Sequence, residues 1–182
     1  MGERSVSAVD TRVDLGGIAL RNPVLTASGT FGYGAEFAPF FDLARIGGIV
    51  AKSITLEPRQ GNQPPRIAET PAGMLNAIGL QNPGVDQVVD RILPTLDFAE
   101  TRFFANVCGS TIDDYVEVTR RFDDSPIDAI EINISCPNIK EGGVQFGNDP
   151  DMSARVVEAC RRVTKKPLIT KLSPNQTDIK EN

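Results

Sequence analysis

The sequence predicts an α/β protein in which parallel strands alternate with helices, and two observations carry that prediction. Short apolar runs alternate with longer amphipathic runs along the 182-residue chain, an order typical of parallel β/α units. Polar or reactive residues follow five successive apolar runs. We find no interdomain linker and no low-complexity segment, so we expect residues 1–182 to form a single domain, with residues 1–12 as a flexible tail.

The predicted elements begin with a β-hairpin over residues 13–20, where Gly16-Gly17 separates two short alternating stretches. A long stretch, residues 54–73, is rich in Pro, Gly, Gln and Arg and is expected to be a functional loop. An extended segment follows over residues 74–79. The predicted parallel strands are residues 23–27, 48–52, 103–107, 127–134 and 167–172. The predicted helices are residues 35–45, 85–96, 112–122 and 152–163.

Two architectures fit this alternation: a doubly wound open sheet and a (β/α)₈ TIM barrel. An open sheet predicts a glycine-rich phosphate loop after the first strand, but the run from Ser28 to Gly34 lacks the G-x-G-x-x-G order. A barrel assembles its site from the ends of several strands, and the polar residues at successive strand ends favour it. A barrel needs roughly 200 residues or more and eight strands. We therefore expect this chain to supply the N-terminal hairpin and about the first five strands of a TIM barrel.

Composition excludes several function classes. Lys plus Arg number 19 and Asp plus Glu 24, a net charge of −5, which argues against a nucleic-acid partner. No apolar run approaches the ~20 residues of a membrane span, and residues 1–10 have no signal-peptide core, so we expect a cytoplasmic protein. The chain has no histidine, and its three cysteines are widely spaced. We expect neither a metal site nor a disulfide framework.

The segment EINISCPN, residues 131–138, is the sharpest candidate for chemistry. An apolar strand delivers Asn133, Ser135, Cys136 and Asn138 to one strand end. Asparagine offers donors and acceptors without charge, which suits a planar heterocycle, and an accessible Cys136 thiolate can act as a base or nucleophile. A lone free cysteine is more often a small buried apolar residue, but the flanking asparagines and the loop setting favour function.

Other strand ends carry weaker signals. Lys52 and Lys171 each follow an apolar run and suit an anionic or electron-rich ligand, although either can be a snorkelling surface lysine. In GMLNAIGLQNPG, Gly79 permits close approach of the backbone to a ligand beside Asn76, or the segment is an ordinary turn. Asn106 ends the third run, where the alternative is a turn-capping asparagine.

Six segments in order resemble the dihydroorotate dehydrogenases: ASGTFGYG, AKSITLEPRQGNQPPR, GMLNAIGLQNPG, FFANVCGS, EINISCPN and KLSPNQTDI. They are most similar to the soluble cysteine-containing class, and within it to the B-type, NAD-linked catalytic subunit. The resemblance runs from about residue 13 to residue 179. It implies a TIM barrel that holds FMN and oxidises dihydroorotate to orotate in pyrimidine (UMP) biosynthesis.

The resemblance also implies residue roles. Cys136 matches the base that removes a proton from C5 of dihydroorotate while hydride leaves C6 for flavin N5. The implied substrate-binding residues are Lys52, Asn76, Ile78, Gly79, Leu80, Asn133 and Asn138. The implied FMN-binding residues are Ala27, Ser28, Lys52, Ser53, Asn106, Asn133 and Lys171. The implied partner is an electron-transfer subunit with FAD and an iron–sulfur cluster, in a homodimer or heterotetramer when full length.

Two alternatives stay open beside the dihydroorotate enzymes. A pyrimidine-reducing barrel of the dihydropyrimidine dehydrogenase type shares a Ser-Cys-Pro turn, although Asn138 after Pro137 favours the dihydroorotate enzymes, since the other family has histidine there. A non-catalytic remnant without flavin is the other alternative, since the family's FMN phosphate site lies in later strands. An open five-strand sheet also exposes strand edges, which predicts self-association.

Overall fold

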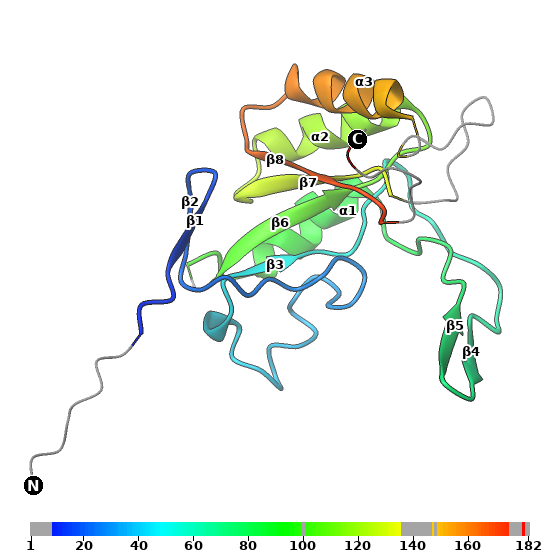
Figure 1. Ribbon diagram of the computed structural model, residues 1–182, viewed down its shortest axis with the longest axis horizontal. Coiled ribbons are helices and arrows are strands. Elements are labelled where there is room, and N and C mark those ends of the chain that lie inside the picture. The colour runs from blue at the N-terminus through cyan, green and yellow to red at the C-terminus, as the bar shows by residue number, and fades with distance from the viewer. Residues whose placement is uncertain (1–8, 100, 136–146, 148, 175–179, 181–182) are drawn as a thin grey trace, which may run out of the picture.

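A computed structural model describes residues 9–99, 101–135, 147, 149–174 and 180. Its centre is a four-stranded parallel sheet in the order β3 (Gly48–Val50), β6 (Arg102–Val107), β7 (Ala129–Asn133) and β8 (Leu168–Lys171), seen in Figure 1. The order across the sheet is the order along the chain. The sheet confirms the last four predicted parallel strands, with β3 and β7 shorter than their predicted ranges.

The predicted first strand, residues 23–27, forms only a single parallel bridge, Leu25 to Gly48. Gly47 N donates to Val24 O at 2.8 Å and Thr26 N to Gly48 O at 3.2 Å. The next rung is made by a side chain, because Val50 N donates to Thr26 Oγ1 at 3.0 Å. The Thr26 hydroxyl thus accepts the hydrogen bond from Val50 N that a backbone carbonyl would accept in a continued strand. The segment therefore lies beside β3 without full pairing.

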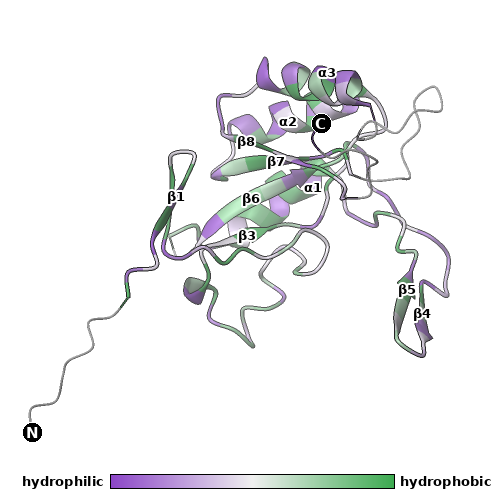
Figure 2. Ribbon diagram, in the orientation of Figure 1, coloured by the Kyte–Doolittle hydropathy of each residue, from purple (hydrophilic) through white to green (hydrophobic). Residues whose placement is uncertain are grey.

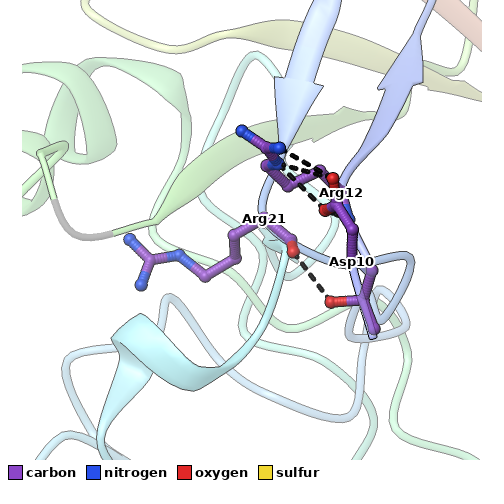
Figure 3. Close-up of polar contacts among 4 residues, drawn as sticks. Asp10, Arg12 and Arg21 are labelled. Atoms are coloured by element: carbon purple, nitrogen blue, oxygen red, sulfur yellow. Dashed lines mark hydrogen bonds and ion pairs between the residues drawn. The ribbon is translucent and has the colours of Figure 1, made fainter. Parts of the chain in front are cut away.

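The predicted N-terminal hairpin is confirmed as β1 (Val13–Leu15) paired antiparallel with β2 (Ile18–Leu20). Gly16 and Gly17 have φ of 59° and 92°, the pair of positive values that a type I′ turn needs. Upstream, Arg12 pairs with Asp10, and Thr11 Oγ1 donates to Arg21 O at 3.1 Å (Figure 3). Residues 9–12 are exposed, and the flexible tail expected over residues 1–12 stays a prediction.

Helices cover one face of the sheet (Figure 1). The predicted helix at residues 85–96 is a succession of α1 (Val85–Gln87), a π turn (Val88–Ile92) and a 3₁₀ turn (Leu93–Thr95). The other two are α2 (Ile112–Asp123) and α3 (Pro150–Arg161). Their buried side chains form one core with alternate strand residues: Ile49, Ala51, Phe103, Ala105, Val107, Ile130 and Ile132 from the sheet and Val88, Tyr115, Val118, Phe122, Val156 and Cys160 from the helices. No helix within the described ranges is both long enough and apolar enough to cross a membrane.

The helix predicted at residues 35–45 is wrong. The segment is a series of turns that ends in one 3₁₀ turn, Leu43–Arg45. Pro39 cannot donate the hydrogen bond of a helix interior, and the Phe37 ring stacks on Phe31 at 4.2 Å between centroids. Phe40, in the middle of the predicted helix, is 87% exposed.

The loop predicted over residues 54–73 contains a strand. β4 (Ile67–Thr70) pairs antiparallel with β5 (Gly73–Asn76), and this hairpin protrudes from the body (Figure 1). All eight residues are exposed on both faces of the hairpin. Because neither face is buried, the sequence has no alternation of apolar and polar residues from which the strand could be predicted.

Candidate functional site

The candidate site lies on the face of the sheet opposite the helices. Side chains alternate between the two faces of a strand, and on this face Val50, Phe104 and Ala129 pack against Ile18 and Leu20 of the N-terminal hairpin. Figure 2 shows hydrophobic (green) stretches along these strands interrupted by hydrophilic (purple) ones. Residues two apart in a strand lie on the same face. Further toward the carboxyl ends of these strands and of β8, the same face therefore carries polar or charged side chains: Lys52, Asn106, Glu131, Asn133 and Lys171. The hairpin closes the apolar end of this face, so its polar end, at the carboxyl ends of the strands, is the candidate site.

The sheet curves strongly around this face. Lys171 Nζ, at the end of β8, donates to Ser28 Oγ at 3.2 Å. Ser28 follows the segment that bridges to β3, at the opposite edge of the sheet. Four steps of ~4.8 Å between flat neighbouring strands would separate those edges by about 19 Å, beyond the reach of one lysine. The curvature therefore brings the first and last sequence-predicted flavin contacts together on the concave face.

Two buried asparagines form the centre of the site. Asn106 is fully buried and Asn133 nearly so. Asn133 Nδ2 donates to Ser53 Oγ at 3.3 Å and to Asn106 Oδ1 at 3.4 Å. Asn133 Oδ1 accepts from Ser135 Oγ at 2.7 Å. The structure thus joins Ser53, Asn106 and Asn133, three of the predicted contacts, in one hydrogen-bonded network.

Sequence reasoning missed Glu131. It faces Asn106 across the β6–β7 pair, and Asn106 Nδ2 donates to Glu131 Oε1. The signal was present, because Glu131 is a single carboxylate between Ile130 and Ile132 in an otherwise apolar strand. A charged side chain at such a position needs a specific partner.

Lys52 lines a cavity of about 480 Å³ together with side chains that the sequence did not single out: Tyr33, Glu36, Arg59, Gln60, Asn82 and Gln87. Asn82, buried, accepts from Thr55 N at 3.2 Å and Gly84 N at 3.0 Å and so holds the wall of the cavity. Burial, and then the charge of Glu36, raise the pKa of the Tyr33 phenol well above its usual value. Tyr33 therefore stays neutral beside Lys52.

The segment Ile78-Gly79-Leu80 is half-buried and held by the preceding loop. Asn62 N donates to Ile78 O at 3.1 Å, and Asn62 Nδ2 to Ala77 O at 3.0 Å. Gly79 has φ of 77°, and a Cβ there would stand 2.6 Å from Asn62 N. The close approach expected of Gly79 is thus to its own loop. Asn76 is exposed at the end of the protruding hairpin and Ala27 is exposed beside Ser28, both apart from the Asn106–Asn133 network.

Cys136 and Asn138 lie outside the described residues. The other cysteines, Cys108 and Cys160, are buried thiols. Burial raises the pKa of the Cys160 thiol, which makes it a poor nucleophile. Within the described part of the chain, no cluster of three or more His, Cys, Asp or Glu residues could hold a metal ion.

Comparison with known proteins places the chain. The model of the family described as "Dihydroorotate dehydrogenase" matches residues 11–182. The chain belongs to the dihydroorotate dehydrogenase family. Its relatives in this family include "Dihydroorotate dehydrogenase B (NAD(+)), catalytic subunit" of Pelobacter propionicus, 55% identical over 171 residues, 93% of this chain and 56% of the relative.

Two further relatives carry the same name. That of Desulforudis audaxviator is 53% identical over 173 residues, 94% of this chain and 56% of the relative. That of Bacteroides thetaiotaomicron is 54% identical over 175 residues, 94% of this chain and 57% of the relative. The chain therefore spans a little over half the length of these dihydroorotate dehydrogenase subunits.

Proposed function

We propose that this chain supplies the N-terminal hairpin and about the first five strands of a (β/α)₈ barrel that oxidises dihydroorotate to orotate. The observation that carries the proposal is the concave polar face, where the Asn106 and Asn133 amides and the Lys171 ammonium group converge at the carboxyl ends of successive strands. Barrel enzymes assemble their sites at these ends. The sequential strand order and the contact between Lys171 and Ser28 support a closed barrel over an open sheet.

The donor set of this face fits FMN. We propose that Ala27, Ser28, Lys52, Ser53, Asn106, Asn133 and Lys171 hold it. The buried amides supply neutral donors and acceptors to the edges of a planar ring, and the two ammonium groups stabilise negative charge that develops on it. FMN, when bound, supplies the hydride acceptor for C6 of dihydroorotate.

We propose Cys136 as the base for C5 of dihydroorotate, at the strand end that Asn133 and Ser135 define. Lys52, Asn76, Asn138 and the Ile78–Gly79–Leu80 backbone are proposed to bind the substrate. The relatives' names, which pair NAD(+) with a catalytic subunit, support a separate electron-transfer partner. We propose that this partner carries FAD and an iron–sulfur cluster, and that the full-length protein forms a homodimer or a heterotetramer. A cytoplasmic location stays a prediction.

The test follows flavin reduction in the complete protein that carries this sequence. We expect it to bind FMN and to bleach the oxidised flavin band when dihydroorotate is added without oxygen. Cys136→Ser is expected to slow this reduction by roughly 10²-fold or more at neutral pH, because a serine hydroxyl is a far weaker acid–base group. The matched control, Cys160→Ala, changes a buried thiol of the helix core and is expected to keep the rate.

Several outcomes contradict the proposal. Equal rates in Cys136→Ser and the control remove Cys136 as the base. Reduction by dihydrouracil in place of dihydroorotate favours a dihydropyrimidine dehydrogenase type of activity. Protein that purifies and stays without flavin after FMN is added supports a non-catalytic remnant.

A further inference from the structure

Glu131 is a single carboxylate in the middle of the concave face. It stands on β7 between the apolar position Ala129 and the site residue Asn133, all on one side of the strand. Its cross-strand neighbour is Asn106 on β6, and Asn106 donates its Nδ2 hydrogen to Glu131 Oε1. Glu131 is only partly buried, whereas Asn106 is fully buried. The carboxylate therefore ends a hydrogen-bonded chain that starts inside the protein.

That chain has only one stable direction. An ionised carboxylate accepts hydrogen bonds and donates none, so Asn106 must turn Nδ2 toward Glu131. Asn106 Oδ1 then faces Asn133 and accepts from its Nδ2 at 3.4 Å. The reversed amide would set a carbonyl oxygen against a carboxylate, which is repulsive. The orientation follows from the chemistry of Glu131 and not from an assignment of oxygen and nitrogen.

The next amide, that of Asn133, has the matching direction. Asn133 Nδ2 donates to Asn106 Oδ1 and to Ser53 Oγ, the latter at 3.3 Å. The other atom of the amide, Oδ1, therefore faces Ser135. That oxygen accepts from Ser135 N at 3.2 Å and from Ser135 Oγ at 2.7 Å. Glu131 thus fixes the Asn106 amide at one end of the chain, and the Ser135 backbone N–H, which can only donate, fixes the Asn133 amide at the other.

We infer that Glu131 is a positioning residue, whose carboxylate holds the Asn106 amide in the orientation that matches the Asn133 amide, so that the pair offers one set of donors and acceptors to the flavin ring. The inference rests on the proposed function, because it concerns how the same face recognises its ligand. The neutral amide introduced by Glu131→Gln would be of similar shape but could accept or donate toward Asn106, so the reversed orientation of the Asn106 amide would gain population. The orientation that fits the ring would then lose population, and the ring would be bound less tightly.

The experiment compares FMN dissociation constants and flavin absorption spectra in the complete protein that carries this sequence. Glu131→Gln is expected to weaken FMN binding roughly tenfold, the equivalent of one charge-assisted hydrogen bond, and to shift the shape of the bound flavin band. Glu131→Asp keeps an acceptor-only group and is expected to retain the wild-type band shape with a smaller loss of affinity. Glu117→Gln, a half-exposed carboxylate on α2, is the matched control and is expected to leave both readouts unchanged.

A double-variant cycle separates positioning from a general effect of charge. If Glu131 acts through Asn106, then Glu131→Gln adds little once Asn106→Ala is present, and its tenfold effect falls to about the noise of the measurement. An undiminished effect in the Asn106→Ala background would overturn the inference, as would a Glu131→Gln protein that matches Glu117→Gln in affinity and spectrum. In both cases the proposed function survives, because the wild-type protein binds flavin. A wild-type protein that binds no flavin overturns the proposed function and this inference with it.

Discussion

Tyr33 and Tyr115 are both buried, but only one of their hydroxyls is paired. Tyr115 Oη donates to Asn133 O at 2.8 Å, whereas Tyr33 Oη has no hydrogen-bond partner among the described residues. A buried polar atom left unpaired costs roughly 1–3 kcal/mol. The same hydroxyl group is therefore expected to stabilise the folded protein at Tyr115 and to destabilise it at Tyr33.

We predict opposite effects of removing the two hydroxyls. Tyr33→Phe is expected to raise the free energy of unfolding by about 1 kcal/mol, and Tyr115→Phe to lower it by about 1 kcal/mol. Urea unfolding followed by circular dichroism measures both. Equal destabilisation by the two substitutions would show that the Tyr33 hydroxyl has a partner, and would contradict the prediction.

At the level of elements, a capping box stabilises the N-terminus of α2. Thr111 Oγ1 accepts from Asp114 N at 3.1 Å, and Asp114 Oδ2 accepts from Thr111 N at 3.1 Å and from Ser110 N at 2.7 Å. Three backbone N–H groups at the start of α2 are thereby satisfied, and those of Thr111 and Asp114 form the reciprocal pair of a capping box. α2 in turn packs on β6 and β7, so its first turn helps to hold the strands that carry Asn106 and Asn133.

We predict that Thr111→Ala lowers the free energy of unfolding by about 1 kcal/mol, the usual cost of losing an N-cap side chain. Ser110→Ala is the control, because Ser110 contributes only its backbone N–H to the box. Chemical denaturation of both variants checks the difference. If the two variants unfold at the same denaturant concentration, the box does not stabilise α2.

A second interaction between elements is a pair of hydrogen bonds that joins the end of α2 to the segment before β8. Thr164 Oγ1 donates to Asp123 Oδ1 at 2.5 Å and Lys165 N donates to the same oxygen at 3.0 Å. These bonds, the Thr164 hydroxyl first, lower the pKa of the Asp123 carboxyl below its ordinary 3.8. A lowered folded-state pKa stabilises the fold above the unfolded pKa, and that stabilisation disappears as pH falls through the folded pKa.

We therefore predict that Asp123→Asn costs stability near neutral pH and progressively less as pH falls below about 4. Unfolding temperatures of the two proteins between about pH 6 and about pH 3 provide the measurement, and the curves are expected to converge at the acid end. Because Asp123 is partly exposed to solvent, which screens its interactions, the difference is expected to be small. Curves that stay parallel over the whole range would show that the carboxylate is not the stabilising group.

The elements also show where sequence reasoning succeeds and fails. β6 and β7 were predictable because their core-facing positions, such as Ile130 and Ile132, are apolar, and α2 because its buried positions recur at helical spacing. The helix expected at residues 35–45 did not form, because Pro39 cannot donate the hydrogen bond of a helix interior and Phe37 stacks on Phe31, which lies outside the predicted helix. The β4–β5 hairpin could not be predicted from its sequence, because all its strand residues are exposed and no alternation of apolar and polar residues marks the strands.

The site was predictable only in part for a related reason. Lys52, Asn106, Asn133 and Lys171 could be proposed because each lies at the end of an apolar run, and β/α topology brings strand ends together. Ser53 was implied only by the family resemblance. Glu131 was missed because only the pairing register of β6 with β7 shows that it faces Asn106. The orientation of the amides depends on that register, and a single sequence does not specify it.

At the scale of the whole molecule, the curved sheet has one edge without a partner in the part of the chain that the structure describes. β8 pairs with β7 alone, while the edge at β3 is partly covered by the segment around Leu25. Unpaired strand edges recruit other strands. Large apolar side chains add exposed surface elsewhere, among them Leu75 at 67% and Met74 at 58% exposure on the protruding hairpin.

We predict that the 182-residue chain, produced alone, self-associates through β8 at concentrations on the order of tens of micromolar. Thr170 is exposed on that strand, and Thr170→Lys is expected to reduce association, because a charge on an edge strand opposes pairing with another chain. Ala154→Lys adds the same charge to the exposed side of α3 and is the matched control. Sedimentation velocity over a concentration series distinguishes the cases. Equal reduction by both lysines would point to net charge and not to the edge, and a wild-type chain that stays monomeric throughout would show that the curvature which joins Lys171 to Ser28 already shields the edge.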